Sequence, residues 1–102
     1  MEIINLTPHK VVLCGIEYPA SGAIARVSMA RLEVGQVGKI PLFSTTFGNV
    51  VGLPLAEEGK FFIVSAIVRS AVPNRTDVGS PADLVRDSGG NVIGCNSLDV
   101  NI

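Results

Sequence analysis

The chain has 102 residues, of which 47% are hydrophobic and 17% are charged, and its formal net charge is −1 at pH 7. A chain of this size and apolar content can bury one core without a metal or a disulfide, so we expect a single domain spanning residues 1–102. The near-neutral charge argues against binding to long nucleic acid. There is no run of about 18 apolar residues and no basic stretch followed by a hydrophobic block, so we predict no membrane segment and a cytoplasmic location.

The first third of the chain is predicted to form short strands joined by turns. Residues 2–6 and 10–15 are rich in Ile, Val and Leu, as strands are. The turn between them falls at Thr7-Pro8-His9, because proline disfavours helical geometry in the residue before it. Residues 16–22 form another short strand that ends in a turn.

The middle of the chain continues this pattern. In residues 23–28, alternation places Ile24 and Arg26 on one face of a strand, opposite Ala25 and Val27. Residues 31–46 are predicted to form two strands around a turn at Gly35 to Gly38, and residues 48–59 a strand followed by a polar loop.

Residues 59–73 contain a continuous apolar run, which fits either a buried strand or a helix. Ser65 can cap a short helix over residues 66–72 that is stopped by Pro73, with residues 60–64 as the preceding strand. Ser65 and Arg69, four residues apart, would then lie on one side of that helix.

The C-terminal region is predicted to be a hairpin, because two β-rich runs flank the turn residues 87–90. Leu84 and Arg86 share a face of its first strand, which places Arg86 on the sheet and not at the tip. The fold class is therefore mostly β (α+β): a compact antiparallel sheet or small barrel-like domain with one short helix and a C-terminal hairpin.

The residue types that bind metals do not form a recognisable motif. Cys14 and Cys95 are isolated in apolar surroundings, so we expect them to be buried free thiols. One histidine and no paired cysteines argue against zinc, and the spacing of Asp77, Asp83 and Asp87 matches no calcium loop. We predict neither a metal nor a cofactor.

Catalytic chemistry has one candidate residue. His9 lies in a turn, where it could act as a general base, but the sequence offers no nucleophile motif for it to activate. A small phosphodiesterase or nucleotide hydrolase that uses His9 with an aspartate is therefore an alternative to a protein that binds without catalysis.

Arginines in apolar segments are the main candidates for a binding site, because an unpaired charge is costly to bury. In the polar stretch 73–87, predicted to hold a long loop over residues 73–82, Arg75 is close to Asp77 and Arg86 is next to Asp87, so internal salt bridges are one interpretation. The other is that arginines hold phosphate oxygens while an aromatic side chain stacks on a base. The candidate ligand-binding residues are Arg75, Arg86, Arg26, Arg69, Ser65, Thr76, Asp77, Phe47 and His9.

The apolar content is high for a monomer of this size. Burial of part of the apolar surface between subunits would resolve this excess, so we predict a homo-oligomer.

The series "NLTPH", "YPASGAIARVS", "FGNVVGLP", "FIVSAIVRSAVPNRTDVGSPADLVRD" and "GNVIGC" resembles a family of small uncharacterised proteins encoded in phage genomes and bacterial prophages. The resemblance spans nearly the whole chain. It implies a role as an inhibitor of host anti-phage defence, since small phage proteins of this size often have such a role and some are oligomers that sequester nucleotide signals of bacterial immunity.

The leading hypothesis is therefore a phage-encoded protein that binds a cyclic nucleotide or an ADP-ribose-like immune signal without cleaving it, in the cytoplasm of an infected or lysogenic host. Arg75 and Arg86 would hold the phosphate, and Arg26 and Arg69 would assist. The hydrolase is one alternative. The other is a protein-binding inhibitor or virion accessory protein, in which the apolar excess forms an interface.

Overall fold

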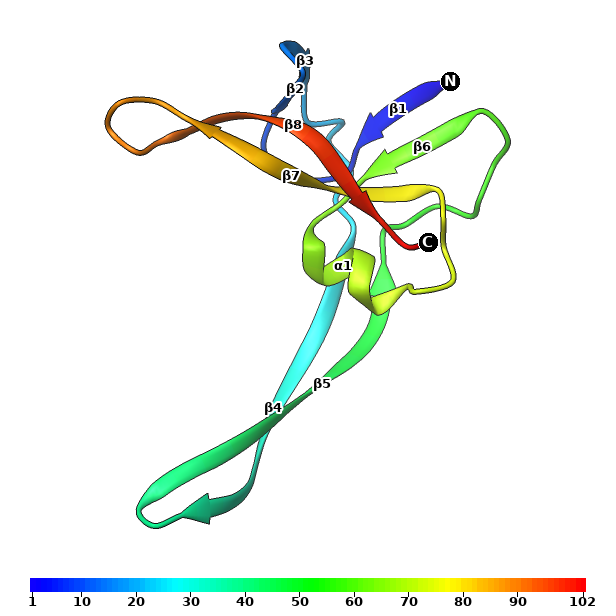
Figure 1. Ribbon diagram of the computed structural model, residues 1–102. Helices are drawn as coiled ribbons and strands as arrows, with labels where there is room; N and C mark the ends of the chain where they lie inside the picture. Colours follow the sequence, from blue (N-terminus) through cyan, green and yellow to red (C-terminus); the bar gives the residue numbers. More distant parts are fainter.

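The computed structural model describes residues 1–102 as a six-stranded sheet with one helix and a two-stranded arm (Figure 1). The elements are β1 (Glu2–Asn5), β2 (Val11–Leu13), β3 (Ile16–Tyr18), β4 (Arg26–Val37), β5 (Ile40–Val51), β6 (Lys60–Ile63), α1 (Ala66–Ala71), β7 (Val78–Arg86) and β8 (Val92–Val100). The predicted class is confirmed: the chain is mostly β, with one short helix and a C-terminal hairpin of β7 and β8.

The six-stranded sheet has the order β1-β6-β7-β8-β2-β3. It is mixed, because β6 pairs in parallel with both β1 and β7, and β2 pairs in parallel with β8. The helix α1 supplies the crossover that the parallel pair β6 and β7 requires. The sheet nearly closes into a barrel, since Asn5 at the end of β1 donates from Nδ2 to the carbonyl of Tyr18 at the end of β3, at 3.0 Å.

The hydrophobic core lies where the sheet, the helix and the base of the arm meet. Its buried members are Leu6, Ala25, Phe62, Val64, Val68 and Val78. The helix begins as predicted, because Ser65 is its N-cap and accepts a hydrogen bond at Oγ from the Val68 amide, at 3.3 Å. It ends one residue before the predicted Val72, which is the C-cap residue ahead of Pro73.

The arm is an antiparallel pair of two 12-residue strands, β4 and β5, that projects away from the rest of the chain, which we call the body (Figure 1). Every residue from 28 to 49 is exposed. The arm explains why the radius of gyration is 16.2 Å, whereas a compact domain of this length has a value of about 13 Å.

The arm is longer than the strands predicted from the sequence. The turn lies at Gly38 and Lys39, between Val37 and Ile40, and not across Gly35 to Gly38. Gly35 belongs to β4, next to a register shift between Glu33 and Gly35 that gives this strand one extra residue. Glycine is common beside such a bulge, so here it does not mark the turn.

The loop predicted over residues 73–82 is also shorter, because β7 already begins at Val78. Pro81 stands inside this strand, where β6 pairs only with Val78 and Gly79. Past that point one edge of β7 has no neighbour, so a proline without an N–H is tolerated there.

The prediction that both cysteines are buried is wrong for Cys14, which is exposed, and correct for Cys95. Cys14 and Gly15 form the two-residue turn between β2 and β3 and have φ values of 51° and 80°. Such turns require positive φ at both positions, and this one leaves Cys14 exposed, with its Sγ donating to the Asn96 carbonyl at 3.3 Å.

Candidate functional site

Arg75 forms the shortest ion pair in the molecule. Its Nε and Nη2 donate to the two oxygens of Asp77, each at 2.7 Å, and Nη2 also donates to the Pro54 carbonyl at 2.9 Å. The hydrogen bond to Asp77 raises the pKa of Arg75, and the same bond holds the pKa of Asp77 below its usual value. In this structure Arg75 therefore joins the loop after α1 to the segment after the arm.

Arg69 is also bonded within the fold. Its Nε donates to buried Ser80 at 2.8 Å, and its Nη1 donates to the Asn101 side chain at 3.2 Å. The Asn101 amide in turn donates to the carbonyls of Arg69, Val72 and Arg75 at 2.9, 3.0 and 3.2 Å. The structure thus brings Arg69, Arg75 and Asp77 into one region, organised by an asparagine that sequence reasoning missed because nothing local marks it.

Arg86 and His9 lie apart from this region. Arg86 is the last residue of β7, is exposed, and donates to the Gly90 carbonyl at 3.0 Å instead of pairing with Asp87. Asp87 accepts from the amides of Asn91 and Gly89 at 3.0 and 2.9 Å, and its pKa is lowered chiefly by the Asn91 backbone bond.

His9 is exposed in the turn between β1 and β2, where its backbone carbonyl accepts from Asn5 Nδ2 at 2.8 Å and from Thr7 Oγ1 at 2.9 Å. It forms an ion pair with none of the aspartates. Thr76 is exposed beside the Arg75–Asp77 pair.

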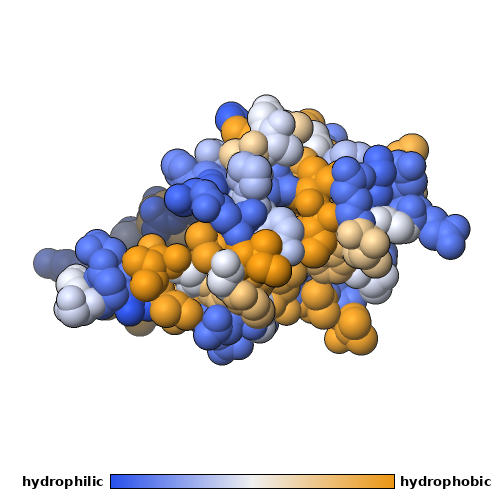
Figure 2. All heavy atoms as spheres, turned by 90° about the horizontal axis from the view of Figure 1, so that it is seen from above, coloured by the Kyte–Doolittle hydropathy of each residue, from blue (hydrophilic) through white to orange (hydrophobic).

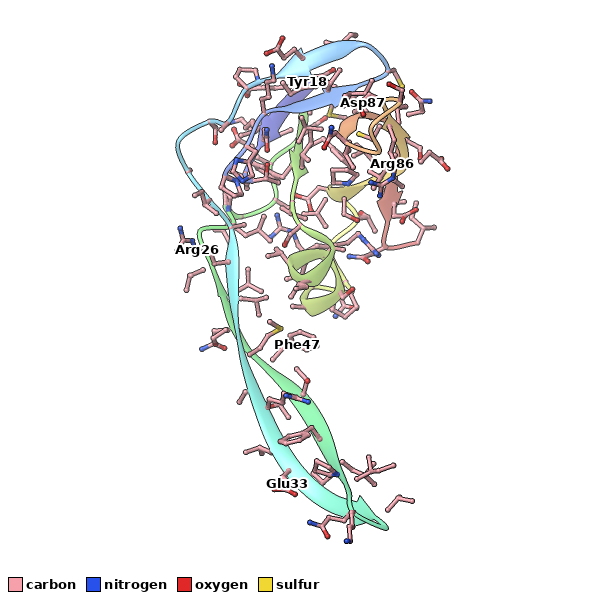
Figure 3. All side chains as sticks on the ribbon, turned by 90° about the vertical axis from the view of Figure 1, so that its left-hand side faces the viewer. Tyr18, Arg26, Glu33, Phe47, Arg86 and Asp87 are labelled. Carbon is pink, nitrogen blue, oxygen red and sulfur yellow. The ribbon has the colours of Figure 1, made fainter.

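The base of the arm brings two more of the predicted residues to one groove. Arg26 and Ser65 both line a groove of about 350 Å³ between the start of β4, the β1–β2 turn and α1. Phe47 lies further along the arm, paired with Met29. Because side chains alternate along a strand, Arg26 and Phe47 lie on opposite sides of the arm, as Figure 3 shows, and do not form one site.

The arm has two different faces, which follow from its strand register. The inner face, continuous with the core-facing Val27, carries Met29, Arg31, Glu33, Gln36, Pro41, Phe43, Thr45 and Phe47. The outer face carries Ala30, Leu32, Gly35, Val37, Ile40, Leu42, Ser44 and Thr46. Between the pairs Met29–Phe47 and Gln36–Pro41, the charged paired residues Arg31 and Glu33 both lie on the inner face, where Arg31 also stacks 3.9 Å from the centre of the Phe43 ring.

The outer face is uncharged, mostly apolar and open to solvent. Leu32, Val37 and Ile40 are 57%, 61% and 66% exposed, respectively. Single exposed apolar residues are normal on a protein surface, but a continuous uncharged face is typical of an interface. This outer face is the most distinctive surface of the molecule.

A second apolar surface lies on the body. A groove of about 520 Å³, which we call the body groove, runs over β2, β7 and β8, and its hydrophobic lining is Val11, Val12, Leu84, Val92, Ile93 and Cys95. Its one charged lining residue, Lys10, lies 3.2 Å from Glu17. Figure 2 shows hydrophobic residues gathered in patches on the upper surface of the body.

Comparisons with protein-family models, with curated proteins and with solved structures found no match. The structure contains no group of three or more His, Cys, Asp or Glu side chains placed to hold a metal ion. Its single helix is too short to cross a membrane.

Proposed function

We propose that the protein acts by binding another polypeptide chain through its β4–β5 arm, and not by catalysis. The observation that carries this proposal is the outer face of the arm, where no charged residue interrupts a row of exposed apolar side chains. Among the alternatives drawn from the sequence, it favours the protein-binding inhibitor or virion accessory protein.

The physical reason is that an isolated two-stranded hairpin is at best marginally stable in water. The residues of this arm beyond its base are exposed on both faces, and the outer edges of β4 and β5 lack a neighbouring strand. Unpaired edges and exposed apolar faces promote association with other chains. A partner that covers the arm would stabilise it and would bury its apolar side chains.

Hydrogen exchange tests this proposal directly. If a partner covers the arm in the working protein, amides in residues 28–49 should exchange about as slowly as those of the β6 and β7 core, although every one of these residues is exposed in the single chain. Fast exchange along the whole arm, at the concentration at which the protein is active, would show a free arm and would contradict the proposal.

Sequestration of a phosphate-bearing nucleotide is a second candidate, favoured because two of the predicted ligand-binding arginines, Arg26 and Arg86, are exposed and have no carboxylate partner. They belong to the arm base and to the end of β7, so a shared phosphate site would need contributions from two chains. Native mass spectrometry should then detect an intact small molecule that is lost in Arg86→Ala, and a protein without such a ligand counts against this candidate.

A further inference from the structure

We infer that the chain that covers the arm is a second copy of this protein, and that two copies exchange arms, each arm's outer face lying in the body groove of the other copy. This inference rests on the proposed function, because it names the partner of the same arm. In this arrangement, the two apolar surfaces of the chain, the outer face of the arm and the body groove, cover each other between two copies.

The chemistry of the two surfaces is matched. The outer face has no charged side chain between Ala30 and Thr46, and the one charge in the body groove, Lys10, already has Glu17 as its partner. Packing these surfaces together therefore removes apolar area from water without leaving an unpaired charge, which is the condition for a stable contact.

The area decides in favour of a reciprocal exchange. From Ala30 to Val37 the outer face is about 27 Å long at about 3.4 Å per residue, and two strands are about 10 Å wide, which gives about 300 Å². A partner surface that covers this whole face of one arm would bury about 600 Å² in total, within the range of chance crystal contacts, whereas two such contacts bury about 1,200 Å², the lower limit of specific interfaces.

The small core gives a further reason why the partner is a copy of the same chain. Only 11 of the 102 residues are buried, although 47% of the sequence is hydrophobic. Subunits of obligate homodimers leave such apolar surface exposed when considered alone, and their folding depends on association. A second copy is the one partner that is present wherever the chain itself is made.

The test compares two adjacent residues on opposite faces of the arm. Ser44 lies on the outer face and Thr45 on the inner face, and both are exposed in the single chain. In light scattering coupled to gel filtration, we expect the natural protein and Thr45→Asp to be dimers and Ser44→Asp to be a monomer. A circular dichroism spectrum of β type for all three would exclude unfolding as the cause.

The groove side is tested with Ile93→Asp, which places a charge in the lining of the body groove. We expect this variant to be monomeric as well. When Ser44→Asp and Ile93→Asp are mixed, one natural arm can still lie in one natural groove, so the mixture should contain more dimer than either variant alone. A dimer that is unaffected by Ile93→Asp, or a mixture without added dimer, would overturn the assignment of the groove.

These outcomes also separate this inference from the proposed function. A natural protein that is monomeric up to about 100 μM, with an arm that exchanges slowly only after a different protein is added, would refute the second copy and retain the arm as a binding element. An oligomer that persists in both Ser44→Asp and Ile93→Asp, with arm amides that exchange rapidly, would refute the second copy and the proposed function alike.

Discussion

At the scale of single residues, the arginines differ in how many hydrogen bonds their side chains make within the chain. Arg75 has three hydrogen-bond acceptors and Arg69 has two within the chain, whereas Arg86 has one carbonyl. The sequence predicted correctly that Arg75 and Asp77 could pair, because they are two residues apart. It did not predict Ser80 or Asn101, since their bonds to Arg69 span 11 and 32 residues.

The Arg75–Asp77 pair makes stability depend on pH. Because the pKa of Asp77 is lowered in the folded state, the pair stabilises the protein above the unfolded-state pKa of about 3.9 and stops doing so as the pH falls through the lower folded-state value. We expect Asp77→Asn to lose about 1–2 kcal/mol of unfolding free energy at pH 7, since both partners are only partly exposed.

Urea unfolding at pH 7 and at pH 2.5 measures this effect, and the deficit of Asp77→Asn should shrink at the lower pH. Asp99→Asn is the matched control, because exposed Asp99 has no ion pair and its loss should change stability by less than about 0.5 kcal/mol. If Asp77→Asn loses the same unfolding free energy at both pH values, the Arg75–Asp77 ion pair is not the source of the loss.

The two thiols should differ in reactivity. Cys95 is 3% exposed, and burial, with a smaller effect of Cys14, raises its pKa. The thiolate is the reactive form, so native Cys95 should resist alkylation while exposed Cys14 is modified. Iodoacetamide labelling at pH 8 followed by peptide mass spectrometry measures both sites, and equal labelling of the two in the folded protein would contradict this prediction.

At the scale of elements, local signals predicted the helix and the C-terminal hairpin but not the arm. Ser65 and Pro73 mark the ends of α1, and the turn residues 87–90 mark the hairpin, because capping and turn chemistry act over a few residues. The sequence pattern predicts several short strands in place of the two long strands of the arm, because two register shifts interrupt the alternation of side chains, one of them beside Gly35. Pairing of β6 with distant β1 leaves no local signal at all.

The start of the arm depends on Gly52, just after β5. It has a φ of 80°, and a Cβ at this position would overlap the Ile24 carbonyl oxygen. Gly59 has nearly the same φ, 81°, with open space around it, so it is a matched control for the backbone conformation. We expect Gly59→Ala to cost about 1 kcal/mol and Gly52→Ala clearly more, because only the latter also displaces the backbone at the arm base. Denaturant midpoints of the two variants give the comparison, and equal losses would contradict the predicted overlap.

At the scale of the whole molecule, the balance between a small core and a large apolar surface connects composition to assembly. The homo-oligomer predicted from the 47% hydrophobic content stays a prediction, but the structure now supplies the surfaces that would form it. Composition could not locate them, because the same residue types fill the core and the arm. Only the fold separates Val64, which is fully buried, from Val34, which is 64% exposed.

The inferred dimer predicts that thermal stability depends on protein concentration. For a dimer that unfolds as it dissociates, we expect Tm to rise by about 3–5 °C for each tenfold increase in concentration. The Ser44→Asp variant should have a lower Tm that does not change with concentration. Scanning calorimetry over a hundredfold range measures this, and a constant Tm for the natural protein would argue against coupled assembly.

The bonds of Asn101 have a consequence for the order in which the chain matures. The arm joins residues that are neighbours in sequence, so its hairpin can form as soon as residue 51 has left the ribosome. The carbonyls at the end of α1 can be bonded by Asn101, and the body groove can obtain its β8 lining, only after the arm has been synthesised. During synthesis, therefore, the apolar arm leaves the ribosome before β8, and a nascent chain exposes the arm before its body groove has formed.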